Sequence, residues 1–116
     1  MNADRSAQVL LDAIARAETA VIAAVEHECA ALRGGRSDEA PRLQARIADA
    51  SRSYLAVIRT ARSRLDRLEF ARPGIRDELE RRRTAFAALL KIELAVLAAV
   101  RAAASDALPP PIGAAA

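Results

Sequence analysis

The chain of 116 residues is rich in alanine, leucine and arginine and carries a formal net charge of +3. Strong helix formers dominate, aromatic residues make up only 3%, and there are four glycines and five prolines, so we expect an all-α fold rather than a β-sheet protein. One cysteine excludes an internal disulfide, and no apolar run is long enough to span a bilayer. We therefore expect a cytoplasmic protein that does not insert into membranes.

Three breaks divide the chain into segments of similar length. They are the pairs Gly34–Gly35 and Pro73–Gly74 and the proline run 109–111. Short connections between long helices favour antiparallel neighbours. The sequence therefore predicts an antiparallel three-helix bundle of long helices with coiled-coil-like packing over residues 1–104, followed by a short, non-helical Pro/Ala-rich tail at 105–116.

The first helix is predicted over residues 3–33, where apolar or small residues recur at steps of three and four. Gly34 suits the left-handed position that closes a helix. The stripe consists of Ala7, Leu10, Ile14, Ala17, Val21, Ala24 and Ala31.

The second helix is predicted over residues 38–70, with Ser37 as its N-cap. Its apolar positions alternate at steps of four and three, which is typical of an amphipathic helix in a bundle. Arg64 fills the one missing step. The stripe consists of Leu43, Ile47, Ala50, Tyr54, Val57, Ala61 and Leu68.

The third helix is predicted over residues 74–104, and it is apolar on nearly every side. From Phe86 to Val100 the only polar residues are Lys91 and Glu93. Two neighbouring helices cover only one face of a third, so we expect the remaining apolar side to bind a partner. The expected partner-binding residues are Leu89, Leu90, Leu94, Leu97, Ala98 and Val100.

The three stripes together predict a hydrophobic core. Glu93 interrupts its stripe near the expected height of Tyr54, so it either accepts a hydrogen bond from that phenol or points to solvent. The expected core residues are Leu10, Ile14, Val21, Leu43, Ile47, Tyr54, Val57, Leu79, Phe86 and Leu90.

The residue types that carry catalysis or bind metals are sparse. His27 and Cys29 are close in sequence, but a helix places them about 200° apart, and there is no second histidine. We find no nucleophile beside a base and no glycine-rich phosphate loop. We therefore expect no metal site, no cofactor and no enzyme activity.

Arginines are concentrated between residues 52 and 83, where ten of them stand among five acidic residues. Such a stretch can bind nucleic-acid phosphates. The interleaved acids and the lack of an aromatic stacking platform favour a solvated helix face instead. Nucleic-acid binding through this arginine-rich face is therefore less favoured than binding of a protein partner.

The first segment ends in the sequence VEHECAALRGG, and the last helix contains FAALLKIEL. Between them lies the second helix, with basic residues at Arg42, Arg46 and Arg52. This pattern resembles the FlgN-type flagellar export chaperones. The resemblance implies a small cytoplasmic chaperone that binds amphipathic C-terminal segments of hook–filament junction subunits before type III export. The apolar last helix fits such a client, because an amphipathic helix can lie in an apolar groove.

A homodimeric coiled-coil structural or adaptor protein with no client is the main alternative. In that case a second copy of the chain would bury the last helix symmetrically. The sequence leaves these two partners, a client helix or a second copy, as open alternatives.

Overall fold

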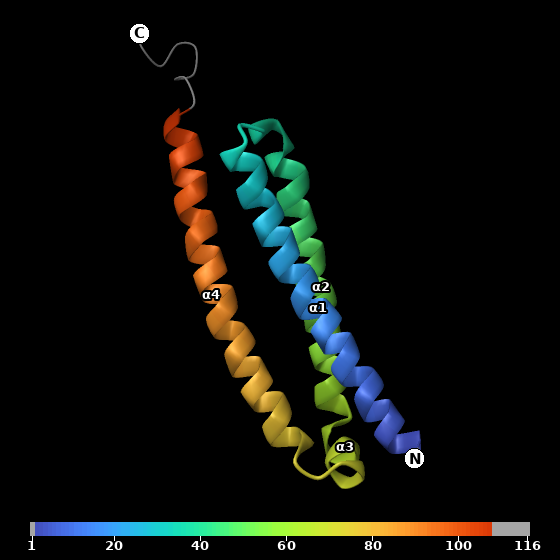
Figure 1. Cartoon of the computed structure of the whole chain (residues 1–116). Coiled ribbons are helices and arrows are strands. Elements are labelled where there is room, and N and C mark those ends of the chain that lie inside the picture. Colours follow the sequence, from blue (N-terminus) through green and yellow to red (C-terminus); the bar gives the residue numbers. More distant parts are fainter. Residues whose placement is uncertain (1, 108–116) are drawn as a thin grey trace.

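A computed structural model describes residues 2–107 of the chain, and every regular element within that range is a helix (Figure 1). The all-α prediction is confirmed. In chain order the elements are α1 (Asn2–Arg33), a short 3-10 helix η1 (Ser37–Glu39), α2 (Ala40–Ser63), α3 (Leu65–Ala71) and α4 (Ile75–Ala107).

The long helices lie side by side in an elongated molecule of 69 × 22 × 21 Å. Helices α1 and α4 run in the same direction and α2 runs in the opposite one (Figure 1). Helix α1 packs against both α2 and α4, whereas the backbones of α2 and α4 approach each other less closely. Helix α4 therefore rests chiefly on α1 and keeps much of its circumference in contact with water.

Two backbone hydrogen bonds in the first turn close the C-terminus of α1. The N–H of Arg36 donates to the carbonyl of Ala31 at 2.8 Å, and the N–H of Gly35 donates to that of Leu32 at 3.2 Å. This is the Schellman arrangement, and its left-handed residue is Gly35 with φ +76°, one position after the predicted Gly34.

The second helix starts later than predicted. Residues Ser37–Glu39 form η1, so α2 begins at Ala40 instead of residue 38. The N-cap of α2 is Glu39, and the predicted N-cap, Ser37, is the first residue of η1.

The single helix predicted over residues 38–70 is wrong, because the chain breaks at Arg64 (φ −107°, ψ 5°) between α2 and α3. Just before the break, the hydroxyl of Thr60 donates to the carbonyl of Ala56 and that of Ser63 donates to the carbonyl of Thr60. Side-chain hydrogen bonds of this kind compete with the helical backbone pattern and bend helices. Arg64, the missing step in the apolar stripe, is the residue at which the helix ends.

The turn from α3 into α4 is held by one carboxylate. Glu69 accepts hydrogen bonds from the backbone N–H groups of Gly74 at 3.0 Å and Arg76 at 2.9 Å. Both bonds favour the ionised form and hold the pKa of Glu69 below its ordinary value. Gly74 has φ +93°, a conformation that favours glycine.

Helix α4 ends later than predicted. It continues through residues 105–107, which the sequence assigned to a non-helical tail, and the rest of that predicted tail lies outside the described residues. Residues 105–107 contain neither proline nor glycine, so the helix meets no breaker there.

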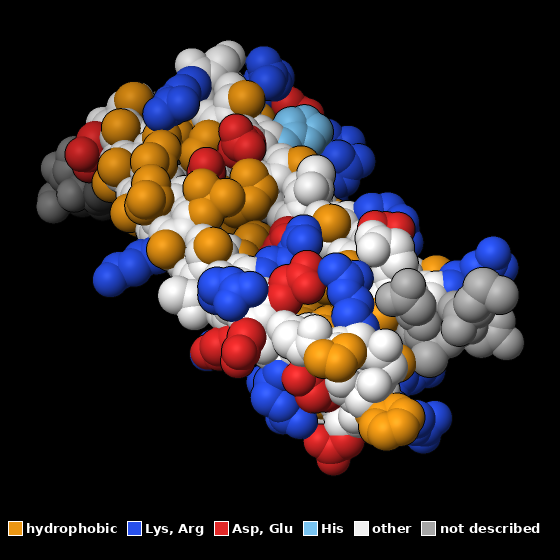
Figure 2. Space-filling view, turned by 60° about the horizontal axis from the view of Figure 1, so that its bottom comes forward, with side chains coloured by type: hydrophobic (Ala, Val, Ile, Leu, Met, Phe, Trp, Pro, Cys, Tyr) orange, Lys and Arg blue, Asp and Glu red, His pale blue; other side chains and the backbone are white. Residues whose placement is uncertain are grey.

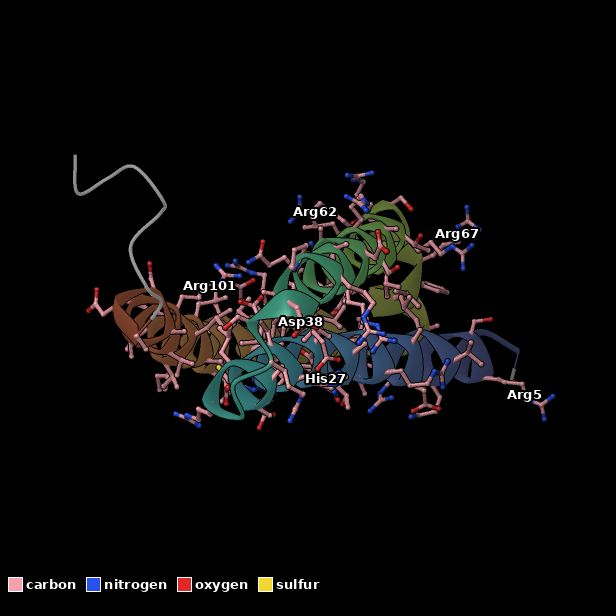
Figure 3. All side chains as sticks on the ribbon, turned by 90° about the horizontal axis from the view of Figure 1, so that it is seen from above. Arg5, His27, Asp38, Arg62, Arg67 and Arg101 are labelled. Atoms are coloured by element: carbon pink, nitrogen blue, oxygen red, sulfur yellow. The ribbon has the colours of Figure 1, made fainter. Side chains whose placement is uncertain are left out.

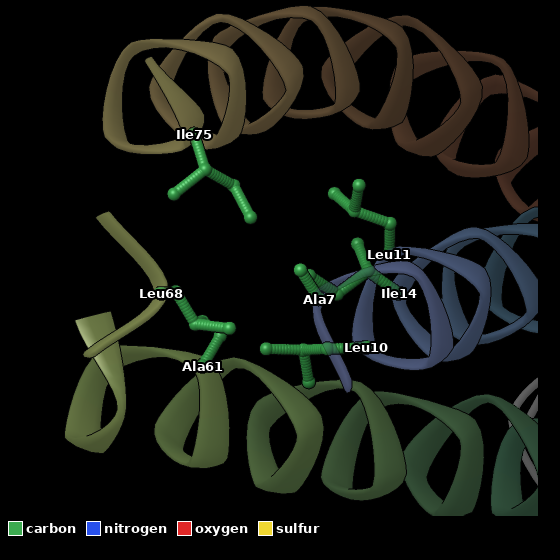
Figure 4. Packing of buried hydrophobic residues seen from close by; sticks show 7 residues of the cluster. All are labelled: Ala7, Leu10, Leu11, Ile14, Ala61, Leu68 and Ile75. Atoms are coloured by element: carbon green, nitrogen blue, oxygen red, sulfur yellow. The ribbon is translucent and has the colours of Figure 1, made fainter. Parts of the chain in front are cut away.

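Buried residues form two clusters at different heights along the molecule. The first core cluster joins α1 to α2, α3 and the start of α4 (Figure 4). It contains Ala7, Leu10, Leu11, Ile14, Ala61, Leu68 and Ile75. The second core cluster joins the end of α1 to α4, and contains Val25, Cys29 and Leu97.

The predicted core residues are all at least half-buried. Those that are fully buried are Leu10, Ile14, Val21, Leu43 and Phe86. The half-buried ones are Ile47, Tyr54, Val57, Leu79 and Leu90.

Candidate protein-binding surface

The predicted partner-binding residues do not share one surface. Leu97 is only 2% exposed and packs with Val25 and Cys29 of α1 in the second core cluster, so its assignment to a partner surface is wrong. Leu90 and Val100 are half-buried against the same cluster. Within α4, these three residues form the row that contacts α1.

The exposed members of the predicted set lie on opposite flanks of that row. Leu89 and Leu94 are 46% and 43% exposed, and Ala98 is exposed as well. Five residues of helix separate Leu89 from Leu94, which places them about 140° apart around the axis. Leu94 and Ala98, four residues apart, share the flank opposite Leu89.

A more continuous apolar surface lies on the flank of Leu89. Ile92 and Val96 follow at steps of three and four residues and are 63% and 40% exposed. We call these three residues, with the exposed alanines of the same flank, the outer stripe of α4. The alanines are Ala85, Ala99 and Ala103.

Figure 2 shows that hydrophobic side chains gather at the end of the molecule that carries the single histidine, whereas charged side chains crowd the other end. Sequence reasoning omitted Ile92 and Val96 from the partner-binding set. Their spacing from Leu89 was the signal that could have identified them.

The outer stripe borders a groove of about 450 Å³ between α1 and α4. Its apolar walls include Ile22 and Ala23 from α1 and Phe86 and Leu89 from α4. At the end of the groove, the carboxylate of Glu18 accepts a hydrogen bond from Arg82 Nε at 3.0 Å, which joins the two helices. The stripe and the groove together form an apolar face limited at one end by this ion pair.

An ion pair between a buried glutamate and a half-exposed arginine fixes the far half of α4 on α1. Glu28 is fully buried, and its two carboxylate oxygens accept hydrogen bonds from Arg101 Nε and Nη2 at 2.6 and 2.8 Å. The hydrogen bond to Glu28 raises the pKa of Arg101 above its ordinary value. Sequence reasoning missed this pair, because Glu28 merely interrupts an apolar row.

A second cavity, of about 410 Å³, lies between α1, α2 and α4 and is lined in part by Tyr54. The ring of Tyr54 packs against Phe86 with 4.8 Å between centroids. Burial, followed by the charge of Glu18, raises the pKa of Tyr54. Of the two alternatives for Glu93, the hydrogen bond with Tyr54 is not formed among the described residues, and the charge of Glu93 acts on Cys29.

His27 and Cys29 occupy different environments. His27 is exposed, and its Nδ1 lies 3.4 Å from Arg46 Nη1. Cys29 is buried, and burial raises the pKa of its thiol, which disfavours the reactive thiolate. Between residues 2 and 107, no three His, Cys, Asp or Glu side chains gather as a metal site would require.

The arginine-rich region 52–83 is partly neutralised by acidic residues, three of them within the region and two, Asp49 and Glu18, outside it. Half of its ten arginines form ion pairs, and Figure 3 shows charged side chains projecting on several sides of the molecule rather than on one. The pairs are Arg52–Asp49, Arg72–Glu78, Arg76–Asp66, Arg82–Glu18 and Arg83–Glu80.

Comparisons with protein-family models, curated proteins and solved structures find no match to this chain. The resemblance to FlgN-type chaperones therefore stays a prediction. No helix between residues 2 and 107 combines the length and hydropathy needed to cross a membrane.

Proposed function

We propose that this chain is a non-enzymatic, cytoplasmic binding protein that holds an amphipathic helix of a client protein along the outer stripe of α4. In this proposal α1, α2 and α4 act as an antiparallel three-helix bundle, with coiled-coil-like packing, that keeps α4 in place. The observation that carries it is the exposure of Leu89, Ile92 and Val96 on one flank of a helix that is held on α1 by a neighbouring buried row. An uncovered apolar strip in water favours contact with another apolar surface.

The size of the surface favours weak, reversible binding. Completing the burial of three half-exposed side chains contributes about 1 kcal/mol each, and the adjoining groove adds contacts of the same kind. Association costs several kcal/mol of lost freedom, so we expect dissociation constants weaker than micromolar. Such an affinity suits a chaperone, which must release its client.

The resemblance to FlgN-type chaperones specifies the client. Those proteins bind the amphipathic C-terminal segments of hook–filament junction subunits before type III export. The proposal is supported by the long first hairpin and by a last helix with apolar side chains left in water.

The test is fluorescence anisotropy with a labelled peptide that carries the C-terminal amphipathic helix of such a subunit. We expect the wild-type chain to bind it and the Ile92→Glu variant to lose binding. The matched control is Leu55→Glu, because Leu55 is 50% exposed but lies on α2. Equal loss in both variants, or no binding by the wild type, refutes the proposal.

A homodimeric coiled-coil adaptor with no client remains the alternative for the same face. It predicts self-association without any peptide binding. Nucleic-acid binding is less favoured, because half of the arginines in the region 52–83 are already paired with carboxylates.

A further inference from the structure

The outer stripe of α4 ends in opposite charges. Arg81 precedes the stripe and Asp106 follows it, both are exposed, and neither forms an ion pair with another described residue. On a regular helix both lie on the edge of the same flank, about 37 Å apart along the axis.

Two copies of α4 with these end charges attract each other only when the helices run antiparallel. In an antiparallel pair of α4 helices, Arg81 of each copy lies beside Asp106 of the other. In a parallel pair, Arg81 faces Arg81 and Asp106 faces Asp106, which is repulsive at both ends. The charges therefore select an antiparallel second copy.

The side chains between the two charges fit the same register. The stripe spans an arc of about 80°, and large residues meet small or medium ones when the helices are antiparallel. The small alanines allow the two backbones to approach closely. The facing positions, one residue from each copy, are Ile92 with Val96, Leu89 with Ala99, and Ala85 with Ala103.

We propose that two copies of this chain pair antiparallel through the outer stripes of α4, with Arg81 and Asp106 forming two symmetry-related ion pairs. The twofold axis lies near the middle of the stripe, between Ile92 and Val96. This dimer is the client-free state and covers the face that the proposed function assigns to a client helix, so client and second copy compete.

The experiment is sedimentation equilibrium of the full chain at low ionic strength, without peptide, with circular dichroism to check that each variant is folded. The wild type is expected to dimerise at micromolar to millimolar concentrations. Arg81→Asp and Asp106→Arg should each weaken the dimer about tenfold, because two attractive pairs become repulsive. The double variant Arg81→Asp with Asp106→Arg should restore it.

Two further variants test the apolar centre. Ile92→Glu should give a monomer, and Leu55→Glu, on α2, should leave the dimer unchanged. A wild-type monomer throughout, a dimer unaffected by Ile92→Glu, or a double charge variant as weak as the single ones overturns the inference.

The outcome is separable from that of the proposed function. A dimer that binds no client peptide supports the inference and refutes the client proposal. A monomer that binds the peptide does the reverse.

Discussion

Removal of Arg101 tests the ion pair with buried Glu28 that holds α4 on α1. The variant Arg101→Met keeps an apolar stem but leaves the carboxylate of Glu28, which is fully buried, without its two hydrogen bonds of 2.6 and 2.8 Å. An unpaired buried charge is strongly destabilising. We expect the free energy of unfolding to fall by about 2–3 kcal/mol. This is below the usual range for fully enclosed pairs, because 45% of the Arg101 side chain is exposed and water screens it.

The two partners are expected to respond unequally. In Glu28→Leu the remaining Arg101 can turn into water, since it is already half exposed, so the loss should be smaller than for Arg101→Met. The double variant Glu28→Leu with Arg101→Met removes the buried charge and should lie within about 1 kcal/mol of the wild type.

Urea unfolding of the four proteins, followed by circular dichroism, measures these differences. For a chain of this size the loss in Arg101→Met corresponds to a fall in melting temperature of about 10 °C. If Arg101→Met costs no more than Glu28→Leu, or if the double variant is the least stable of the four, the carboxylate is not enclosed as described and the reasoning is wrong.

The fold and the charge pattern lead to four other predictions. Phe86→Ala should lower the free energy of unfolding in urea by about 3–5 kcal/mol, because Phe86 is only 7% exposed. Leu97→Glu should abolish the folded circular dichroism signal, because it places a charge in the second core cluster. The pKa of Glu69 is lowered in the folded chain, so the ionised carboxylate stabilises the fold. This stabilisation is full above the ordinary glutamate pKa and is lost as the pH falls through the lowered value. The wild type should therefore lose its advantage in unfolding free energy over the Glu69→Gln variant on acidification. We expect no salt-sensitive nucleic-acid binding, measured by gel shift; strong binding that disappears in Arg81→Glu with Arg82→Glu contradicts this.

The helices were predictable because their apolar spacing and their breaks agree. The first turn contains two glycines, and the last turn contains a Pro–Gly pair. The break at Arg64 was missed, because no glycine or proline marks it. Its signals were weaker: a charged residue at an apolar step, after a threonine and a serine that bond back to the helix.

The side of α4 that remains in water was harder to predict. Helix α4 is apolar on almost every side between Phe86 and Val100, so the sequence pattern permits several rotations of α4 toward α1. Sequence reasoning placed Leu97 outside and left Ile92 and Val96 out of the partner surface, whereas the structure buries Leu97 and exposes Ile92 and Val96. What decides the orientation is a long-range contact, because Arg101 must face Glu28 on α1.

The same contact explains why a surface helix this apolar stays in one orientation. Apolar contacts alone would hold several rotations of α4 against α1 with similar energy, since leucine, valine and isoleucine occur on several sides. The ion pair between Glu28 and Arg101 forms in only one of them, because any other rotation leaves a buried carboxylate unpaired. The outer stripe is therefore presented to water as a consequence of where α1 buries a charge. Loss of Arg101 should lower stability and also allow α4 to rotate on α1, so that the outer stripe no longer has one fixed position. Partner binding should therefore weaken even though no residue of the stripe has changed.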